Sequence, residues 1–261
     1  MSILDEIVAA KKEELIETMR ACPLEELLAR ISEETPVSFT SALDREGINI
    51  IAEIKYRSPS QGAFRCQLPP EQVARLYSEN GAAAVSVLTE RNHFEGDLGF
   101  LDEINQGLPA LPLLRKDFIV DRYQVVETRR SPASAYLLIV SCLSQGELED
   151  LIDYGRELNL EALVEVHDPY ELEIAVEQGA RTIGVNNRNL KTFDVSIETS
   201  FDIARRMEGE EGYLLVSESG IERHSQILEL GDAGFSAYLI GSSLMNSENP
   251  GERLHELQGE G

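Results

Sequence analysis

Charged and amide side chains stand at the ends of several short apolar runs in this sequence. They are Glu53, Lys55, Lys116, Glu165, Asn186 and Glu218. Ammonium groups and carboxylates that lie close together shift one another's pKa values, so one site can hold both a proton donor and a proton acceptor near neutral pH. If the fold brings these ends together, we expect general acid–base chemistry there.

The pair Glu53 and Lys55 shows why the pattern is unusual. Residues i and i+2 of a strand point to the same side, so both charges share one side while Ile54 points to the other. A charged pair at the end of an apolar strand costs desolvation free energy and is a weak source of stability. A buried structural ion pair is one interpretation of this motif, and an active site is the other. Similarly, Lys116 taken alone can be explained as a side chain that extends to a polar rim.

The apolar runs predict eight β-strands, and amphipathic segments between them predict helices. The strands are expected at residues 50–55, 83–88, 111–116, 135–140, 162–166, 182–186, 213–218 and 237–241. The helices are expected at residues 70–80, 98–106, 121–130, 145–158, 169–178, 197–207, 222–230 and 250–257. Asp168 followed by proline is a helix start, Ser144 and Glu147 have the spacing of a capping box, and Gly81, Gly179 and Gly231 are candidate C-terminal caps.

Eight β/α units in 261 residues predict an α/β protein of the (β/α)8 barrel type, with a doubly wound open sheet as the alternative. Residues 1–48 precede the first strand and contain two helical patterns, so we expect an N-terminal helical extension packed on the barrel. No linker interrupts the chain, which predicts a single domain over residues 1–261.

In such barrels the active site lies at the carboxyl ends of the strands, where all of the charged ends listed above would meet. The last two predicted strands are followed by small residues, Ser219-Gly220 and Gly241-Ser242. Small residues let backbone N–H groups approach an anion, and phosphate sites in barrels often use these two loops. The alternative is a plain turn, since Gly and Ser favour turns for local reasons.

Composition excludes several functional classes. The net charge of −24 argues against binding to nucleic acid or to an anionic membrane surface. No apolar run approaches the roughly 20 residues of a membrane span, and the acid-rich N-terminal stretch does not resemble a signal peptide. Three widely spaced cysteines predict reduced thiols in a cytoplasmic protein. Metal-ligand spacings and nucleotide-binding glycine motifs are absent, so we expect no cofactor.

Seven motifs together resemble the indole-3-glycerol phosphate synthase family of tryptophan biosynthesis. In chain order they are IAEIKYRSPSQG, SVLTERNHFEG, LPLLRKDFIVDRYQV, LVEVHD, GVNNRNLKTF, VSESGI and LIGSSLM. The resemblance runs from about residue 38 to residue 257. It implies a cofactor-free (β/α)8 barrel lyase that converts 1-(2-carboxyphenylamino)-1-deoxyribulose 5-phosphate into indole-3-glycerol phosphate, with loss of CO2 and water.

The resemblance also implies roles for individual residues. It favours Lys116 as the acid in ring closure, Lys55 in substrate anchoring and dehydration, and Glu165 as the base; which lysine protonates the ketone stays open. The catalytic set is completed by Glu53, Asn186 and Glu218. The phosphate and its surroundings are assigned to Ser58, Arg188, Ser219, Gly220, Gly241 and Ser242, and the aromatic ring to Phe94, Phe118 and Leu190.

Some expectations depart from the family or leave alternatives. Glutamate is common in the family where this chain has Ser242, so we expect altered phosphate affinity there rather than lost activity. His167 is interpreted as a loop residue, because the following Asp168 already explains the local sequence as a helix cap. The alternatives are a related phosphosugar barrel, such as phosphoribosylanthranilate isomerase, and a catalytically silent barrel. We expect a monomer with a small-molecule substrate, and leave open association with other tryptophan-pathway enzymes.

Overall fold

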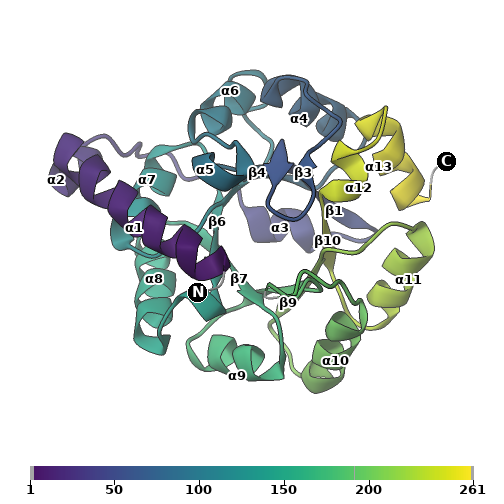
Figure 1. Cartoon of the computed structure of the whole chain (residues 1–261). Helices are drawn as coiled ribbons and strands as arrows, with labels where there is room; N and C mark the ends of the chain where they lie inside the picture. The colour runs from purple at the N-terminus through teal and green to yellow at the C-terminus, as the bar shows by residue number, and fades with distance from the viewer. Residues whose placement is uncertain (1–2, 191, 260–261) are drawn as a thin grey trace.

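The strands form one closed parallel barrel, as the sequence predicts (Figure 1). The computed structural model describes residues 3–190 and 192–259. The order around the barrel is β1-β10-β9-β8-β7-β6-β5-β4, and β4 pairs with β1 to close it. The strands are β1 Asn49–Ile54, β4 Ala84–Leu88, β5 Leu113–Lys116, β6 Ala135–Ile139, β7 Glu161–Val166, β8 Thr182–Asn186, β9 Leu214–Glu218 and β10 Ala237–Ile240.

Helices follow the strands and surround the barrel, within two residues of their predicted bounds. They are α4 Pro70–Glu79, α6 Gly99–Gly107, α7 Arg122–Arg130, α8 Gln145–Glu157, α9 Pro169–Glu177, α10 Glu198–Met207, α11 His224–Asp232 and α13 Pro250–Gln258. Shorter elements lie between them: the hairpin of β2 Arg57–Ser58 and β3 Gly62–Ala63, α5 Arg91–Phe94, η1 Val140–Cys142 and α12 Ser242–Met245.

The capping predictions are confirmed with one exception. Asp168 accepts hydrogen bonds from the first backbone N–H groups of α9, and Ser144 forms the capping box of α8. The prediction for Gly231 is wrong, because α11 continues through it to Asp232. The chain instead leaves α11 through Gly234, whose φ of +102° is a conformation that glycine adopts without steric cost.

The inward faces of the strands change character along the barrel axis. Lower in the barrel they form an apolar cluster, whose members include Ile51, Leu114, Leu163 and Val216. Two residues further along the same strands, the inward positions are Glu53, Lys116, Glu165 and Glu218. Because strand side chains alternate, residues two apart share the interior face. The apolar layer therefore supports a ring of charges at the carboxyl ends.

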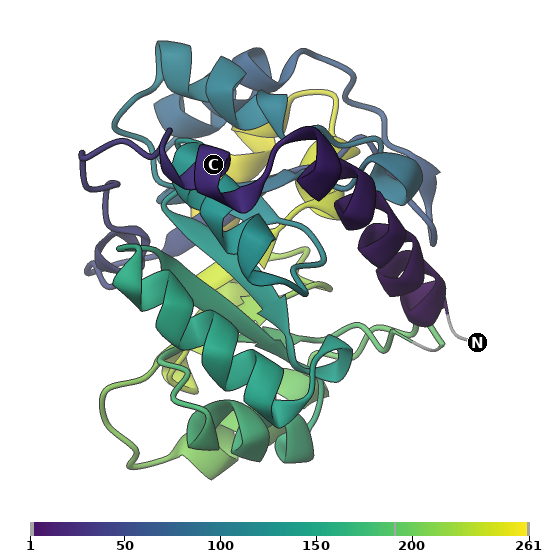
Figure 2. The ribbon, with the colours of Figure 1, turned by 90° about the vertical axis from the view of Figure 1, so that its left-hand side faces the viewer.

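Residues 3–48 form three helices rather than the two predicted, namely α1 Ile3–Ala21, α2 Leu24–Leu28 and α3 Phe39–Leu43. Phe39 and Leu43 of α3 are fully buried in the interior cluster, so α3 closes the amino-terminal end of the barrel. The long helix α1 lies over the end of the barrel at which the strands finish, with its start close to the loop after β8 (Figures 1 and 2). Its Leu15 packs in a small cluster with Leu27 of α2 and Val126 of α7. None of the helices within the described residues is both long and apolar enough to cross a membrane.

Candidate active site

A cavity of about 320 Å³ opens at the carboxyl ends of the strands. Every site residue predicted from the sequence lines it, although the assigned roles stay predictions. These residues are Glu53, Lys55, Ser58, Phe94, Lys116, Phe118, Glu165, Asn186, Arg188, Leu190, Glu218, Ser219, Gly220, Gly241 and Ser242. The parallel strands explain this, since each delivers its last inward side chain to the same end of the barrel.

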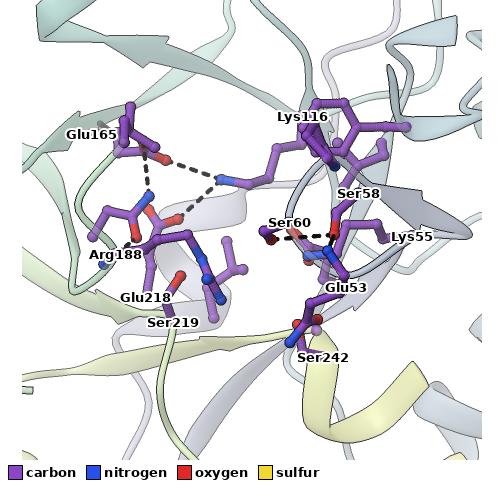
Figure 3. A pocket seen from close by; sticks show the side chains of 18 of the residues that line it. Glu53, Lys55, Ser58, Ser60, Lys116, Glu165, Arg188, Glu218, Ser219 and Ser242 are labelled. Carbon is purple, nitrogen blue, oxygen red and sulfur yellow. Dashed lines mark hydrogen bonds and ion pairs between the residues drawn. The ribbon is translucent and has the colours of Figure 1, made fainter. Parts of the chain in front are cut away.

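Lys116 lies at the centre of the charged ring (Figure 3). Its Nζ is 3.1 Å from Oε2 of Glu165 and 3.0 Å from Oε2 of Glu218. Asn186 donates from Nδ2 to Oε1 of Glu165 at 3.1 Å. Both carboxylates are almost fully buried, with exposures of 2% and 1%. The ammonium thus joins two carboxylates that water barely reaches.

Burial and pairing set the protonation of this group. Burial opposes the charge on Lys116, but the neighbouring carboxylates, led by Glu218 and Glu165, outweigh it and hold the pKa of Lys116 above its ordinary value. Burial likewise opposes the charge on Glu165, yet Lys116 and His167 keep the pKa of Glu165 below its usual range. For Glu218, burial and the charge of Glu165 prevail over Lys116 and raise its pKa to about 7. One of the two carboxylates is therefore ionised at neutral pH, and the other titrates close to it.

Glu53 and Lys55 form the second charged pair of the cavity, with Lys55 Nζ in contact with Oε2 of Glu53. They face the mouth from the same side of β1, as their spacing predicts. The Lys55 ammonium also lies 5.3 Å from the ring centre of Phe64, over its face. Gly241 permits this arrangement, because a Cβ at that position would overlap the Glu53 carboxylate. A larger residue there would displace the acid from the site.

The loop after β9 has the geometry expected of a backbone anion site. Ser219 and Gly220 both have positive φ, at 67° and 79°. Asn187, which is 2% exposed, donates to the carbonyl of Ser219 and to the hydroxyl of Ser217, at 3.1 Å each. Its own side-chain oxygen accepts from Ser200. Left-handed backbone at a serine is costly, and the Asn187 network holds the loop in this shape.

The opposite part of the cavity is apolar. The rings of Phe94 and Phe118 lie 6.1 Å apart, between centres, at the position predicted for an aromatic group. Sequence reasoning missed a second set of apolar lining residues, Ile3, Leu4 and Ile7 of α1 and Phe193 and Val195 of the loop after β8. The amphipathic pattern of α1 indicates that one face is covered, but it does not indicate where on the barrel the helix lies.

His167 was also missed as part of the site. It follows β7 and lies 3.2 Å, through Nε2, from Oε1 of Glu165. Its Nδ1 is 2.9 Å from Oε2 of Glu171 in α9. The spacing of four residues between His167 and Glu171 was the available signal, and the capping role of Asp168 obscured it. Across residues 3–190 and 192–259, no group of three or more His, Cys, Asp or Glu residues could hold a metal ion.

A closed parallel barrel with partly buried lysines and buried carboxylates at its mouth defines a (β/α)8 barrel of the acid–base enzyme class. The fold is shared with distant solved structures. A crystal structure of 3-hexulose-6-phosphate synthase matches with a TM-score of 0.62 at 10% identity, covering 82% of this chain and 99% of that one. The thiamine phosphate pyrophosphorylase of Pyrococcus furiosus matches with a TM-score of 0.59 at 15% identity, covering 82% and 95%. These likenesses concern the fold alone.

Sequence relationships are much closer. A model of the indole-3-glycerol phosphate synthase family matches residues 4–257. The indole-3-glycerol phosphate synthase of Carboxydothermus hydrogenoformans is 41% identical, covering 97% of this chain and 98% of that one. The enzyme of the same name from Salinibacter ruber is also 41% identical, covering 100% and 97%. The chain belongs to the indole-3-glycerol phosphate synthase family, as its motifs predict, and the prediction of a carboxy-lyase of tryptophan biosynthesis is confirmed with it.

Proposed function

We propose that the barrel mouth converts 1-(2-carboxyphenylamino)-1-deoxyribulose 5-phosphate into indole-3-glycerol phosphate, CO2 and water, with Lys116 and Glu165 as its central acid and base. The observation that carries this proposal is the position of Lys116 Nζ, 3.1 Å from Glu165 and 3.0 Å from Glu218 inside the cavity. In a catalytically silent barrel, three carboxylates and two ammonium groups in the pocket would cost desolvation free energy without any catalytic benefit.

Ring closure requires a cation next to the ketone oxygen. The ring carbon that bears the carboxylate attacks the ketone carbon, a C–C bond forms, and the carbonyl electron pair moves to oxygen. Lys116 then gives its proton to that oxygen. Its pKa is raised, so it is fully protonated at neutral pH, and an alkoxide is still a stronger base than the resulting amine. Lys116 can therefore act as donor despite its carboxylate partners.

The remaining steps use the second pair of charges. Loss of CO2 breaks the bond between the ring and its carboxyl carbon, and the released electron pair restores the aromatic ring. Dehydration then needs a proton on the departing hydroxyl and a base for the proton lost from the neighbouring carbon. We assign Lys55 to the hydroxyl and Glu165 to the carbon-bound proton, because Glu165 stays ionised. Glu53 holds the Lys55 ammonium in place through their ion pair.

The two ends of the substrate differ in chemistry, and so do the two ends of the cavity. We assign the phosphate to the loops after β9 and β10 and to Arg188, and the aromatic ring to Phe94, Phe118 and Leu190. Backbone N–H groups and an arginine suit a phosphate, and paired aromatic rings suit a planar apolar group. The hairpin of β2 and β3 carries Ser58 at the rim, where it closes the mouth beside the phosphate end.

We further propose that residues 1–261 act as one domain and as a cytoplasmic monomer. Support comes from α1, because Ile3, Leu4 and Ile7 complete the cavity and Lys11 forms a buried ion pair with Asp117, next to Lys116. The three cysteines are free, which suits a reducing compartment. Sedimentation with and without other tryptophan-pathway enzymes tests the monomer and any association.

Indole fluorescence tests the proposed reaction directly. The chain has no tryptophan, so new indole emission stands clear of the protein's own signal. We expect emission to grow when the parent protein meets the substrate and to fall by about 10²-fold or more in rate for Lys116→Ala. Lys12→Ala, an exposed lysine of α1, is the matched control and should retain activity. No emission from folded parent protein, at low or high salt, would favour the silent barrel.

A further inference from the structure

The imidazole of His167 lies between two carboxylates. Its Nδ1 is 2.9 Å from Oε2 of Glu171, and its backbone N–H donates to the same oxygen at 2.9 Å. On the other side, Nε2 lies 3.2 Å from Oε1 of Glu165, an ion-pair contact without aligned hydrogen-bond geometry. Lys116 contacts the other oxygen of Glu165. The Glu165 carboxylate therefore has a nitrogen partner on each oxygen.

Local sequence places Glu171 for this contact. Asp168 caps the first backbone N–H groups of α9, and Pro169 begins the helix. Glu171 then lies in the first helical turn, where a negative charge is favoured, and its side chain reaches back to the residue before the cap. The backbone N–H of His167 then holds the Glu171 carboxylate beside the imidazole.

His167 does not line the cavity, so it acts through Glu165 and not on substrate. Its side chain is only 13% exposed, and Glu171 is 16% exposed. Burial alone would lower the pKa of the imidazole, but the Glu165 and Glu171 carboxylates raise it to about 10. Neighbouring elements bring further titratable groups near His167, Glu165 and Glu171. These groups are Lys116 of β5, the Cys142 thiol of η1, and Asp5 and Lys12 of α1 near that thiol. Burial raises the pKa of Cys142 to about 12, so it adds no charge near neutral pH.

We propose that His167 is a positioning residue for Glu165: its imidazolium, clamped by Glu171, holds the Glu165 carboxylate ionised and turned toward Lys116. The inference rests on the proposed function, in which Glu165 acts as the base. Without this second cation, three buried carboxylates would share two ammonium groups, and the acid with the weaker partner would take up a proton. A protonated Glu165 cannot accept the proton that dehydration releases.

Two measurements test the clamp, and the first needs no activity. In protein labelled with ¹³C at histidine Cε1, NMR titration should show the His167 imidazole protonated up to about pH 9, and Glu171→Gln should lower its midpoint by about one unit or more. His167→Asn and His224→Asn assign the two resonances among the four histidines of the chain. A parent midpoint near the ordinary histidine value would overturn the proposal.

The second measurement follows kcat and KM against pH. For His167→Asn we expect kcat to fall about tenfold or more at pH 6 and to recover partly at pH 8.5, with KM within about twofold. Glu171→Gln, which retains the ring, should shift the acid limb in the same direction. His224→Asn, at a histidine that contacts the Leu257 carbonyl and does not line the cavity, should keep the parent profile. An acid limb that is unchanged in both His167→Asn and Glu171→Gln overturns the proposal. If the parent protein forms no product, the proposed function is contradicted, and the NMR titration alone decides whether Glu171 keeps the His167 imidazole protonated.

Discussion

Lys116 and Glu218 stand on opposite sides of the barrel, on β5 and β9, yet their charged atoms are 3.0 Å apart. The lysine side chain spans the mouth to make this contact, which places its ammonium over the barrel axis. Gly184 of β8 leaves room for the Glu218 side chain, since a Cβ there would overlap the Glu218 carboxylate. Side chains from β7 and β9 thus hold the Lys116 ammonium that β5 supplies.

The two lysines should separate in single-turnover kinetics at saturating substrate. Lys116→Ala should slow CO2 release and indole emission together, by about 10²-fold or more, because ring closure precedes both. Lys55→Ala should slow indole emission more than CO2 release, since we assign Lys55 to dehydration, which follows decarboxylation. Rapid-quench detection of CO2 beside stopped-flow fluorescence makes the comparison. Equal slowing of both signals in Lys55→Ala would place Lys55 in ring closure and reverse the assignment.

The contribution of the Glu218 carboxyl to the free energy of unfolding should depend on pH. Its pKa is raised to about 7, so between about pH 4.5 and pH 7 the carboxyl is neutral in the folded protein but ionised in the unfolded chain. The folded state then binds the extra proton, and this contribution to the free energy of unfolding is full below pH 4.5 and is lost as the pH rises through 7. Glu218→Gln should remove that loss and raise the free energy of unfolding by about 1–3 kcal/mol at pH 8, with little change at pH 4.5.

Urea unfolding at the two pH values measures this difference. Glu222→Gln is a matched control, because Glu222 is an exposed carboxylate in the next loop. A stabilisation that is the same at both pH values, or that also occurs in the control, would show that Glu218 does not titrate as proposed.

Asn187 should affect substrate binding through the loop it holds. Asn187→Ala removes the contact to the Ser219 carbonyl, so we expect KM to rise about tenfold with kcat changed less than about threefold. Buried groups of Ser200 would also lose their partner, at a cost of about 1–3 kcal/mol in stability. Ser217→Ala, which touches Asn187 but leaves the Ser219 contact intact, is the control. Identical KM values in the two variants would show that the contact between Asn187 and the Ser219 carbonyl does not affect substrate binding.

Salt should stabilise the protein, because its net charge of −24 implies strong self-repulsion at low ionic strength. Raising NaCl from about 0.05 M to about 0.3 M shortens the screening length, and we expect the free energy of unfolding in urea to rise by on the order of 1 kcal/mol. An unchanged or lower free energy of unfolding at the higher NaCl concentration would mean that self-repulsion does not limit stability.

Sequence patterns predicted the barrel and the charged ring for a physical reason. Strand side chains alternate, and a parallel barrel brings all carboxyl ends to one rim, so Glu53, Lys116 and Glu165 meet once the strands are located. The prediction depends on which residues of each strand face inward, because a shift of one residue would turn each charge away from the interior. The observed inward positions agree with it.

What the sequence did not predict depends on contacts between distant segments. The pattern of α1 indicates a covered face that includes Ile7, but not that this face completes the cavity. The sequence predicted two N-terminal helices and not three; α2 and α3 have only five residues each, and burial of Phe39 and Leu43 in the barrel stabilises α3. His167 is a local exception: its interpretation followed the cap residue Asp168, and the contact with Glu171 four residues later was overlooked.

The central claim is that this mouth closes an indole ring with loss of CO2. The most direct test supplies the parent protein with substrate labelled with ¹³C in the carboxyl group and follows ¹³CO2 and indole emission together. We expect both to appear, in equal amounts, and neither to appear at a comparable rate with Lys116→Ala. Folded parent protein that releases no ¹³CO2, or releases it without any indole emission, would contradict the account.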